Sequence, residues 1–297
     1  MKNNIPLQKN IATSISAAIR QKFSITKLNT LAGGCINTAY AVNDGDRYFF
    51  IKLNTARSLF MFEAEYQALL ELENANTLHV PHPISTGHYD KYAWLAMEYL
   101  PLQNDGNHHK LGEQLAAMHK VTRDRFGWDR DNTIGSTLQI NTPGDDWLKF
   151  FRHNRLEYQL KLAAAKGYTG SLQKAGATLV DCMDDFFSDY TPVPSLLHGD
   201  LWSGNYAFIE NGDPVLFDPA LYYGDREADI AMTELFGGFS NDFRSSYEAC
   251  WPLDDGFKTR RHLYNCYHVL NHLNLFGGGY ARQAEDMMMR LLSERNA

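Results

Sequence analysis

Long apolar runs are absent from this sequence. No run of about 18 uninterrupted apolar residues, the length that a membrane-spanning helix requires, occurs among the 297 residues. Polar side chains interrupt residues 1–22, where a secretory signal peptide would have an apolar core. We therefore expect a cytoplasmic protein that does not associate with membranes.

Cysteine is scarce, and its spacing does not fit a metal or disulfide framework. The four cysteines are Cys35, Cys182, Cys250 and Cys266. They lie far apart without a CxxC pair, which excludes a disulfide-stapled scaffold and a thiolate zinc site. His268 and His272 are four residues apart, but no third ligand accompanies them, so we expect histidines that pack or lie at the surface.

The chain also lacks an excess of basic residues. Lys and Arg number 28 against 35 Asp and Glu, which gives a net charge of −7. Nucleic acids and anionic membranes are bound by basic surfaces, so neither is an expected partner. Because 44% of the residues are apolar, the chain can bury a sizeable core, and small molecules remain the expected ligands.

The periodicity of apolar residues changes near residue 100 and predicts two lobes, 1–100 and 101–297. The first lobe contains strand patterns at 25–33, 39–42 and 47–53, a helical pattern at 58–74, and two more short strands after VPHPI (80–84), the second at 92–100. The second lobe is mostly helical in pattern. The predicted fold class is therefore α+β, with a small antiparallel sheet and one helix in the first lobe and a larger, mainly helical second lobe.

The segment LLHGDLWSGN, residues 196–205, precedes a predicted hairpin. Asn211-Gly212 between apolar strands is a strong signal for a two-residue turn. Such a turn would place Asn205 opposite Asp218, with Cβ atoms about 5 Å apart. Amide and carboxylate oxygens are suitable ligands for Mg²⁺, so the pair predicts a magnesium site.

The spacing of Asp200, Asn205 and Asp218 matches the layout of a kinase catalytic loop. In that layout an aspartate accepts the proton of the acceptor hydroxyl, an asparagine five residues later binds metal, and a later aspartate binds metal. The sequence therefore predicts phosphoryl transfer with Asp200 as the base. The alternative is a plain hairpin followed by an unrelated aspartate.

Lys52 is the expected phosphate-binding lysine. Strand alternation places it on one face with Tyr48 and Phe50. A two-residue turn at Asp44-Gly45 would set Lys52 opposite Asn37, beside the glycine pair Gly33-Gly34, whose backbone N–H groups could approach phosphates closely. The predicted cofactor is ATP.

Two further parts of a nucleotide site can be sought in the first lobe. A carboxylate on the predicted helix should orient Lys52, and helical periodicity leaves Glu63 and Glu65 equally placed. The strand that joins the lobes should contact adenine through its main chain. These connecting residues are Met97, Glu98, Tyr99 and Leu100.

These motifs resemble the fructosamine kinase, or ketosamine 3-kinase, family over nearly the whole chain. The most specific elements are HGDLWSGN with Trp202, the run FDPALYYGDREADIAM, and NLFGG at 274–278. GGCIN, MFEAE and WLKFFRHNRLEYQL are also similar. The resemblance implies the protein-kinase-like fold of aminoglycoside phosphotransferases. It also implies ATP-dependent phosphorylation of the 3-hydroxyl of a ketosamine, which makes the adduct unstable and releases the amine. On the resemblance, Glu65 is the partner of Lys52.

Other residues of the same motifs receive roles with alternatives. Trp202 could stack on the sugar or its aminomethyl group, or it could be a core residue. Asp225 is expected to support the catalytic loop, and Arg226 to lie in the cleft without an assigned role. Cys35 matches a cysteine associated with redox control in several relatives, or is a small filler.

Two other functions stay open on the sequence. The acceptor could be another hydroxylated amine, such as an aminoglycoside or choline, or the chain could be a nucleotide-binding pseudokinase that acts as a sensor. The identity of the sugar, the choice between a free and a protein-bound amine, and the choice between monomer and homodimer are not readable from the residues.

Overall fold

The computed structural model describes residues 1, 4–31 and 36–295. The chain forms two compact units, one of residues 1–107 and 207–218 and one of residues 108–206 and 219–297. The first boundary lies seven residues after the predicted one, and residues 207–218 belong to the first unit although the prediction placed them in the second. The α+β class is confirmed.

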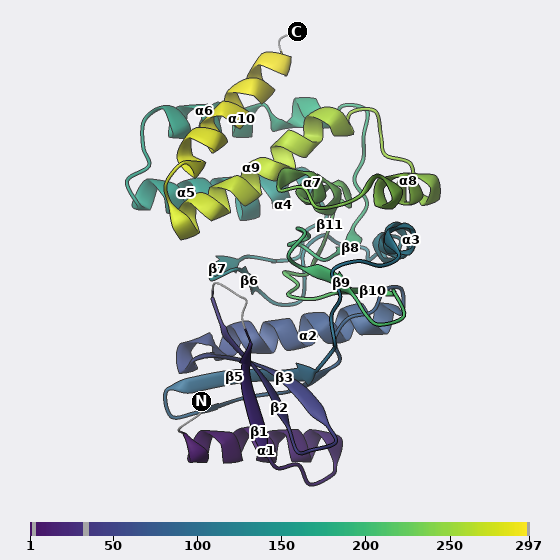
Figure 1. Cartoon of the computed structure of the whole chain (residues 1–297). Helices are drawn as coiled ribbons and strands as arrows, with labels where there is room; N and C mark the ends of the chain where they lie inside the picture. Colours follow the sequence, from purple (N-terminus) through teal and green to yellow (C-terminus); the bar gives the residue numbers. More distant parts are fainter. Residues whose placement is uncertain (2–3, 32–35, 296–297) are drawn as a thin grey trace. The chain divides into compact units, whose positions relative to one another are not determined.

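The first unit is built on a five-stranded antiparallel sheet with strand order β1-β2-β3-β5-β4 (Figure 1). The strands are β1 (Lys27–Leu31), β2 (Thr38–Asn43), β3 (Tyr48–Thr55), β4 (Pro83–Tyr89) and β5 (Tyr92–Glu98). Along β3, Phe49, Ile51 and Leu53 alternate with Phe50 and Lys52. Successive side chains point to opposite faces, so β3 offers one apolar face and a second face that carries the lysine.

A helix covers each face of this sheet, so the prediction of one helix was wrong. Besides α2 (Leu59–Ala75), the unit contains α1 (Ile5–Ile19). The side chain of Asn4 accepts a hydrogen bond from the N–H of Leu7 and begins α1, while Leu7, Ile11 and Ile15 pack with the apolar face of β3. Figure 1 shows the sheet between α1 and α2.

The register of β2 and β3 differs from the prediction by two residues. Asn43 pairs with Tyr48, and the N–H of Asp44 donates to the C=O of Arg47 at 3.3 Å, so the turn is centred on Gly45-Asp46 rather than on Asp44-Gly45. Lys52 therefore pairs with Ala39 and not with Asn37. A displacement by two keeps every side chain on its face, whereas a displacement by one reverses it, so Lys52 still lies on the predicted face.

Residues 207–218 join the first unit through backbone hydrogen bonds. They contain most of β9 (Tyr206–Phe208) and all of β10 (Pro214–Leu216). Gln103 and Phe208 exchange hydrogen bonds of 2.7 and 2.9 Å, and the N–H of Leu216 donates to the C=O of His79 at 3.0 Å. The segment thus completes the first unit from a distant part of the sequence.

The second unit is mainly helical and surrounds α9. Its helices are α3 (His108–His119), α4 (Trp147–Phe151), a π-helical turn (Arg152–Glu157), α5 (Tyr158–Ala165), α6 (Ser171–Asp181), α7 (Glu227–Leu235), α8 (Asn241–Cys250), α9 (Phe257–Phe276) and α10 (Tyr280–Arg295). Short strands pair as β6 (Asn132–Ile134) with β7 (Thr137–Gln139) and β8 (Ser195–Leu197) with β11 (Tyr222–Gly224). Most of α9 is buried, and it packs against α5, α7 and α10.

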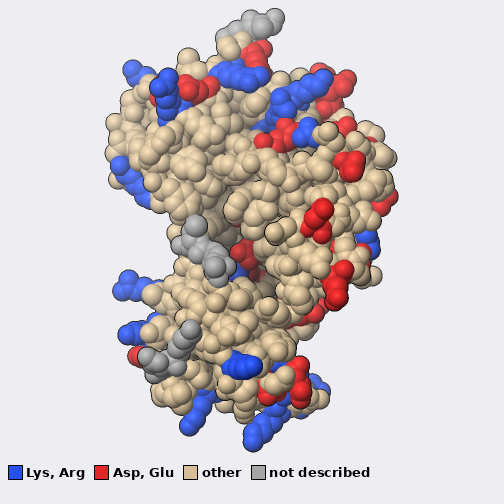
Figure 2. Space-filling view, viewed as in Figure 1, with Lys and Arg blue, Asp and Glu red and all other residues tan. Residues whose placement is uncertain are grey.

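The surface carries both signs of charge. Figure 2 shows basic and acidic side chains interspersed on the face in view, without a continuous basic area. Among the described residues, no helix combines the length and apolar character needed to cross a membrane.

Candidate active site

Lys52, Glu65 and Asp218 form a charged cluster within the first unit. The Nζ atom of Lys52 lies 2.5 Å from Oε1 of Glu65 and 2.5 Å from Oδ1 of Asp218. Lys52 and Glu65 are buried, whereas the side chain of Asp218 is 45% exposed. The cluster thus presents one partly exposed carboxylate above a buried ion pair.

The elements that carry these residues explain the choice of Glu65. It lies on the buried side of α2 with Phe62, Ala68 and Leu69, whereas Glu63 lies on the exposed side. Glu65 therefore faces the lysine-bearing face of β3. The pairing that the resemblance implied is confirmed.

Burial and charge act in opposite directions on this cluster. Burial alone would lower the pKa of Lys52, but the carboxylates of Asp218 and Glu65 outweigh it and raise that pKa. Burial raises the pKa of Glu65 against the opposing attraction of Lys52. Lys52 is thus a stable cation, which suits a group that binds phosphates.

Asp218 lies just beyond β10 in an uncommon backbone conformation. Its φ is 59°, in the left-handed region that costs a non-glycine residue about 1–3 kcal/mol and that is enriched at functional sites. This conformation turns Asp218 out of the strand direction, and its carboxylate reaches Lys52.

The predicted register of the hairpin that precedes Asp218 was wrong by one residue. The N–H of Ile209 donates to the C=O of Asp213 at 2.9 Å, so the turn contains three residues, 210–212. Gly212 ends the turn with a φ of 80°, as in a three-residue turn that closes with a glycine bulge. The count that set Asn205 directly opposite Asp218 therefore fails, and their joint metal role stays a prediction.

The loop of residues 198–205 lies in the second unit and closes on itself. Nδ2 of Asn205 donates to the backbone C=O of Asp200 at 2.8 Å and to its carboxylate at 3.3 Å. The N–H of Trp202 donates to the same C=O at 3.1 Å. Because the nitrogen of the Asn205 amide is engaged, its Oδ1 is the atom suited to a cation.

Asp229 on α7 anchors this loop, a role that was not predicted from the sequence. Its carboxylate accepts the backbone N–H groups of His198 at 2.7 Å and Gly199 at 2.9 Å. Nε2 of His119 also lies 3.2 Å from it. The acidic run at the start of α7 was the available signal, but the role was expected of Asp225.

The charge state of this anchor follows from its partners. Burial would raise the pKa of Asp229, but His119 and the backbone of Gly199 are among the groups that hold it below its usual value. Burial lowers the pKa of His119. An ionised carboxylate only accepts hydrogen bonds, so Nε2 of His119 donates to Asp229 and Nδ1 accepts from the hydroxyl of Tyr247 at 2.8 Å.

Gly199 allows the loop to approach the following segment. Its φ is 82°, and a Cβ atom there would lie 2.1 Å from the carbonyl oxygen of Ala220. The N–H of Ala220 donates to the C=O of His198 at 2.9 Å. Only glycine fits this position without displacing the backbone.

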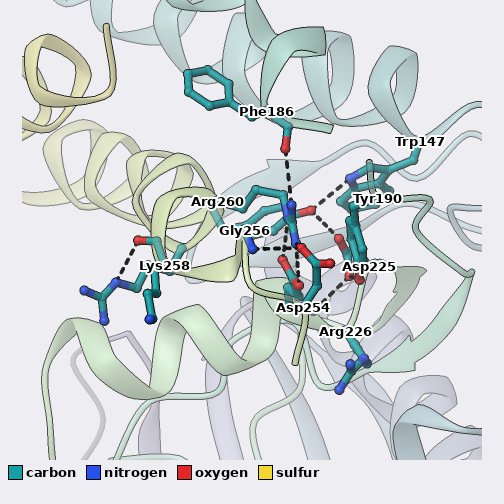
Figure 3. Close-up of polar contacts among 12 residues, drawn as sticks. Trp147, Phe186, Tyr190, Asp225, Arg226, Asp254, Gly256, Lys258 and Arg260 are labelled. Atoms are coloured by element: carbon teal, nitrogen blue, oxygen red, sulfur yellow. Dashed lines mark hydrogen bonds and ion pairs between the residues drawn. The ribbon is translucent and has the colours of Figure 1, made fainter. Parts of the chain in front are cut away.

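Asp225 supports the start of α7 rather than the loop itself. It accepts hydrogen bonds from Tyr190 at 2.9 Å, Tyr264 at 2.5 Å and the N–H of Glu227 at 3.0 Å. Arg260 holds Glu227 through two hydrogen bonds of 2.7 and 2.9 Å. Figure 3 shows Arg260, Tyr190 and Asp225 converging from different elements. The network fixes the helix that presents Asp229 to the loop.

Arg226 is not a cleft residue. It is 5% exposed, with its guanidinium 4.0 Å from the centre of the Trp251 ring. It also donates to the carbonyl oxygens of Trp251 and Pro252 at 2.9 and 2.6 Å. Its contacts explain a packing role at the end of α8.

Trp202 is 39% exposed, which contradicts the alternative of a core tryptophan. Its ring lies over Gly204, where a Cβ atom would be 2.2 Å from the indole. Because Gly204 has no side chain, it leaves room for the ring at the surface of the loop. The contact with substrate remains a prediction.

The remaining predicted nucleotide contacts are only partly described. Gly33, Gly34 and Cys35 lie outside the described residues. Oδ1 of Asn37 accepts a hydrogen bond from Asn54 at 2.8 Å.

The connecting strand begins buried and ends partly exposed. Met97 is buried and pairs with Phe50. The N–H of Glu98 donates to the C=O of His82 at 2.8 Å. The ring of Tyr99 lies 5.9 Å from that of Tyr48, and Leu100 is partly exposed. Adenine binding by these four residues remains a prediction.

Within the described ranges, no group of three or more His, Cys, Asp or Glu side chains could hold a metal ion. His268 is buried, and burial lowers its pKa to about 3. It therefore packs as a neutral side chain in α9, in agreement with one of the two roles expected for it.

Comparisons with known proteins give consistent matches. The fructosamine kinase family model matches residues 7–294. A Synechocystis sp. protein named a probable ketoamine kinase is 43% identical over 96% of both chains. The chloroplastic protein-ribulosamine 3-kinase of Arabidopsis thaliana is 42% identical over 88% of this chain and 81% of its own. A crystal structure from Haemophilus somnus, described as a candidate fructosamine-3-kinase, has a TM-score of 0.88 at 28% identity and covers 95% of this chain and 96% of its own.

Proposed function

The chain belongs to the fructosamine kinase family, and on this premise we propose that it transfers the γ-phosphoryl group of ATP to the 3-hydroxyl of a ketosamine. A ketosamine is a sugar joined through its C1 to an amine. The relatives named ketoamine kinase and protein-ribulosamine 3-kinase support this class of acceptor. The observation that carries the kinase assignment is the buried Lys52–Glu65 pair with Asp218 beside it.

Asp200 is the proposed base. It accepts the proton of the 3-hydroxyl as the oxygen bonds to the γ-phosphorus and the bond from that phosphorus to ADP breaks. The hydrogen bonds from Asn205 and Trp202 to its backbone C=O, and the anchor of the loop at Asp229, support a fixed position for it. Rigid placement is the main protein contribution to this chemistry.

Lys52 is the proposed phosphate ligand. A lysine held by Glu65 keeps its charge and its direction, so it can neutralise phosphate oxygens without a large reorganisation. Asp218 is 2.5 Å from the same Nζ atom. We propose that Gly33, Gly34 and Asn37 contact the phosphates, and that residues 97–100 contact adenine.

Asn205 and Asp218 are the proposed ligands of Mg²⁺. Their oxygen donors fit this cation, because Mg²⁺ is commonly held by one or two protein oxygens together with phosphates and water. The engaged nitrogen of Asn205 leaves its amide oxygen as the ligand atom. When bound, the metal would neutralise charge on the transferred phosphoryl group.

The product explains a repair role. A phosphate ester at C3 makes the sugar adduct unstable, so the amine is released. We propose deglycation as the outcome. The pseudokinase alternative receives no support, because Lys52, Asp200, Asn205 and Asp218 are all present.

The test measures ADP formation with a ribulosamine and with an aminoglycoside as acceptors. We expect turnover with the ribulosamine, and a loss of about 10²- to 10⁴-fold in kcat for Asp200→Asn with ATP binding retained. Asp218→Asn should instead raise the magnesium concentration needed for activity. Asp145→Asn, whose side chain is 82% exposed, is the matched control and should behave as the unaltered protein. Turnover of the aminoglycoside alone would overturn the proposed acceptor, and equal loss in Asp200→Asn and Asp145→Asn would overturn the proposed base.

A further inference from the structure

A row of aromatic side chains begins in the catalytic loop and continues across the second unit. Ring centres are 6.4 Å apart for Trp202 and Phe236, 5.0 Å for Phe236 and His272, and 5.6 Å for His272 and Phe276. The ring centre of Tyr280, on α10, lies 5.2 Å from that of His272, on α9. We call these five residues the aromatic row.

The row is partly open to solvent. Phe236 is 40% exposed and Phe276 is 56% exposed, beside Trp202 at 39%. Single exposed apolar side chains are normal on soluble proteins, but a continuous group of large rings indicates a binding surface. This group is continuous with the loop that carries Asp200.

The backbone fixes Phe236 against that loop. Phe236 ends α7, and a Cβ atom at the nearby Gly238 would lie 2.4 Å from Cβ of Ser203. The hydroxyl of Tyr206 donates to the C=O of Gly238 at 2.6 Å. Gly238 thus lets the chain after Phe236 pass close to the loop of residues 198–205, where the row begins.

The middle ring of the row is neutral. Nδ1 of His272 lies 2.8 Å from the C=O of His268, which can only accept, so this nitrogen carries the hydrogen. Burial lowers the pKa of His272, which keeps the ring uncharged at neutral pH. The row therefore offers ring faces without a positive charge.

We infer that the aromatic row binds the substituent carried by the amine of the ketosamine, and that it favours apolar and aromatic substituents. This inference rests on the proposed function. The amine is only a few bonds from the 3-hydroxyl. If Trp202 contacts the sugar or its aminomethyl group, the substituent on the amine extends from the sugar past Trp202. The secondary ammonium is attracted to ring faces, and the apolar substituent gains from contact with Phe236 and Phe276.

The exposed end of the aromatic row does not limit the size of the acceptor. Because Phe276 is at the surface, the far end of the substituent is not enclosed by the described part of the second unit. A ketosamine on a protein side chain can then use the same contacts as a small one. The row selects for the character of the substituent rather than for its length.

The experiment compares two ribulosamines, one made from methylamine and one from benzylamine, in the unaltered protein, in Phe236→Ala and in Phe276→Ala. We expect Phe236→Ala, which removes the ring next to Trp202, to raise KM for the benzylamine acceptor about fivefold, the factor for the loss of one ring contact. Its kcat should stay within about twofold, and KM for the methylamine acceptor and for ATP should not change. Phe276→Ala should act in the same direction and more weakly, because Phe276 lies further along the row.

Met289→Ala is the matched control, because Met289 is also 56% exposed and lies on α10. It should leave both acceptors unaffected. Equal changes for the two acceptors, or no change with either, in Phe276→Ala and Phe236→Ala would overturn the role of the row while leaving the proposed function standing. If the unaltered protein phosphorylates neither ribulosamine, the proposed function is wrong and the inference falls with it.

Discussion

Replacing Asp229 with asparagine should disturb the loop of residues 198–205 without unfolding the protein. The carboxylate accepts two backbone N–H groups, from His198 and Gly199, and is 2% exposed. An asparagine has one acceptor oxygen, and its NH₂ group cannot accept. At least one buried N–H group therefore loses its partner.

The size of the effect follows from these contacts. A buried donor left without a partner costs about 1–3 kcal/mol, and the remaining hydrogen bond loses the strength that the charge gave it. We expect Asp229→Asn to lower the free energy of unfolding by about 2 to 4 kcal/mol, less than the roughly 5–15 kcal/mol of a typical domain. The variant stays folded, so its kinetics can be measured.

The assay is urea unfolding combined with steady-state kinetics. We expect kcat to fall about tenfold or more because Asp200 loses its fixed position, with KM for ATP unchanged because Lys52 lies in the other unit. Glu234→Gln is the control on the same helix. Its partners are Arg244 and Arg261 at partly exposed positions, so it should change stability by no more than about 1 kcal/mol.

The pH dependence gives a second readout. The folded pKa of Asp229 lies below its usual value of 3.8, so its contribution to stability is present above that pH and is lost as the pH falls through the folded pKa. The stability difference between the unaltered protein and Asp229→Asn should shrink below about pH 4. A variant with unchanged stability and full kcat at neutral pH would refute the anchoring role.

Two further substitutions test the packing that surrounds the site. Gly199→Ala should lower the free energy of unfolding by more than about 2 kcal/mol and should lower kcat, because its Cβ would meet the carbonyl of Ala220. The control is Gly167→Ala, because Gly167 has a similar φ of 90° with nothing within 4 Å, so that substitution should lower the free energy of unfolding by only about 1 kcal/mol. Equal unfolding midpoints for the two variants would contradict the clash. His268 is buried, and burial lowers its pKa from 6.5 to about 3. As the pH falls below 6.5, the unfolded chain therefore binds a proton at this histidine and the folded protein does not, which lowers the free energy of unfolding. His268→Phe should therefore flatten the loss of stability between about pH 6.5 and 4. His109→Phe changes a side chain that is 65% exposed and should not flatten this loss. Parallel curves of stability against pH for the two variants would contradict the role of His268.

A sequence-based prediction stayed correct where the error in strand register left each side chain on its predicted face of the sheet. The turn between β2 and β3 is centred one residue later than predicted, which shifts the register by two residues, yet Lys52 stayed on the face that meets α2. An error of one residue had a larger effect at the second hairpin. Asn211-Gly212 fits a two-residue turn and equally the end of a three-residue turn, and local sequence does not distinguish them.

Other features depended on contacts that local patterns do not encode. Leu7, Ile11 and Ile15 form a narrow apolar stripe within a polar segment, and only the apolar face of the sheet shows what α1 packs against. The acidic residues Asp225, Glu227 and Asp229 lie within one turn and a half. Which of them reaches a loop about 30 residues earlier depends on the packing of α7 against Arg260, Tyr190 and Tyr264.

The first unit contains residues 207–218, which are synthesised long after its other residues, 1–107. A nascent chain that ends at residue 107 lacks the backbone partners of His79, Gln103 and Asn107. It also lacks Asp218, so Lys52 and Glu65 meet as a pair before the third charge arrives. The first unit therefore cannot reach its final form on the ribosome until more than two thirds of the chain has been translated.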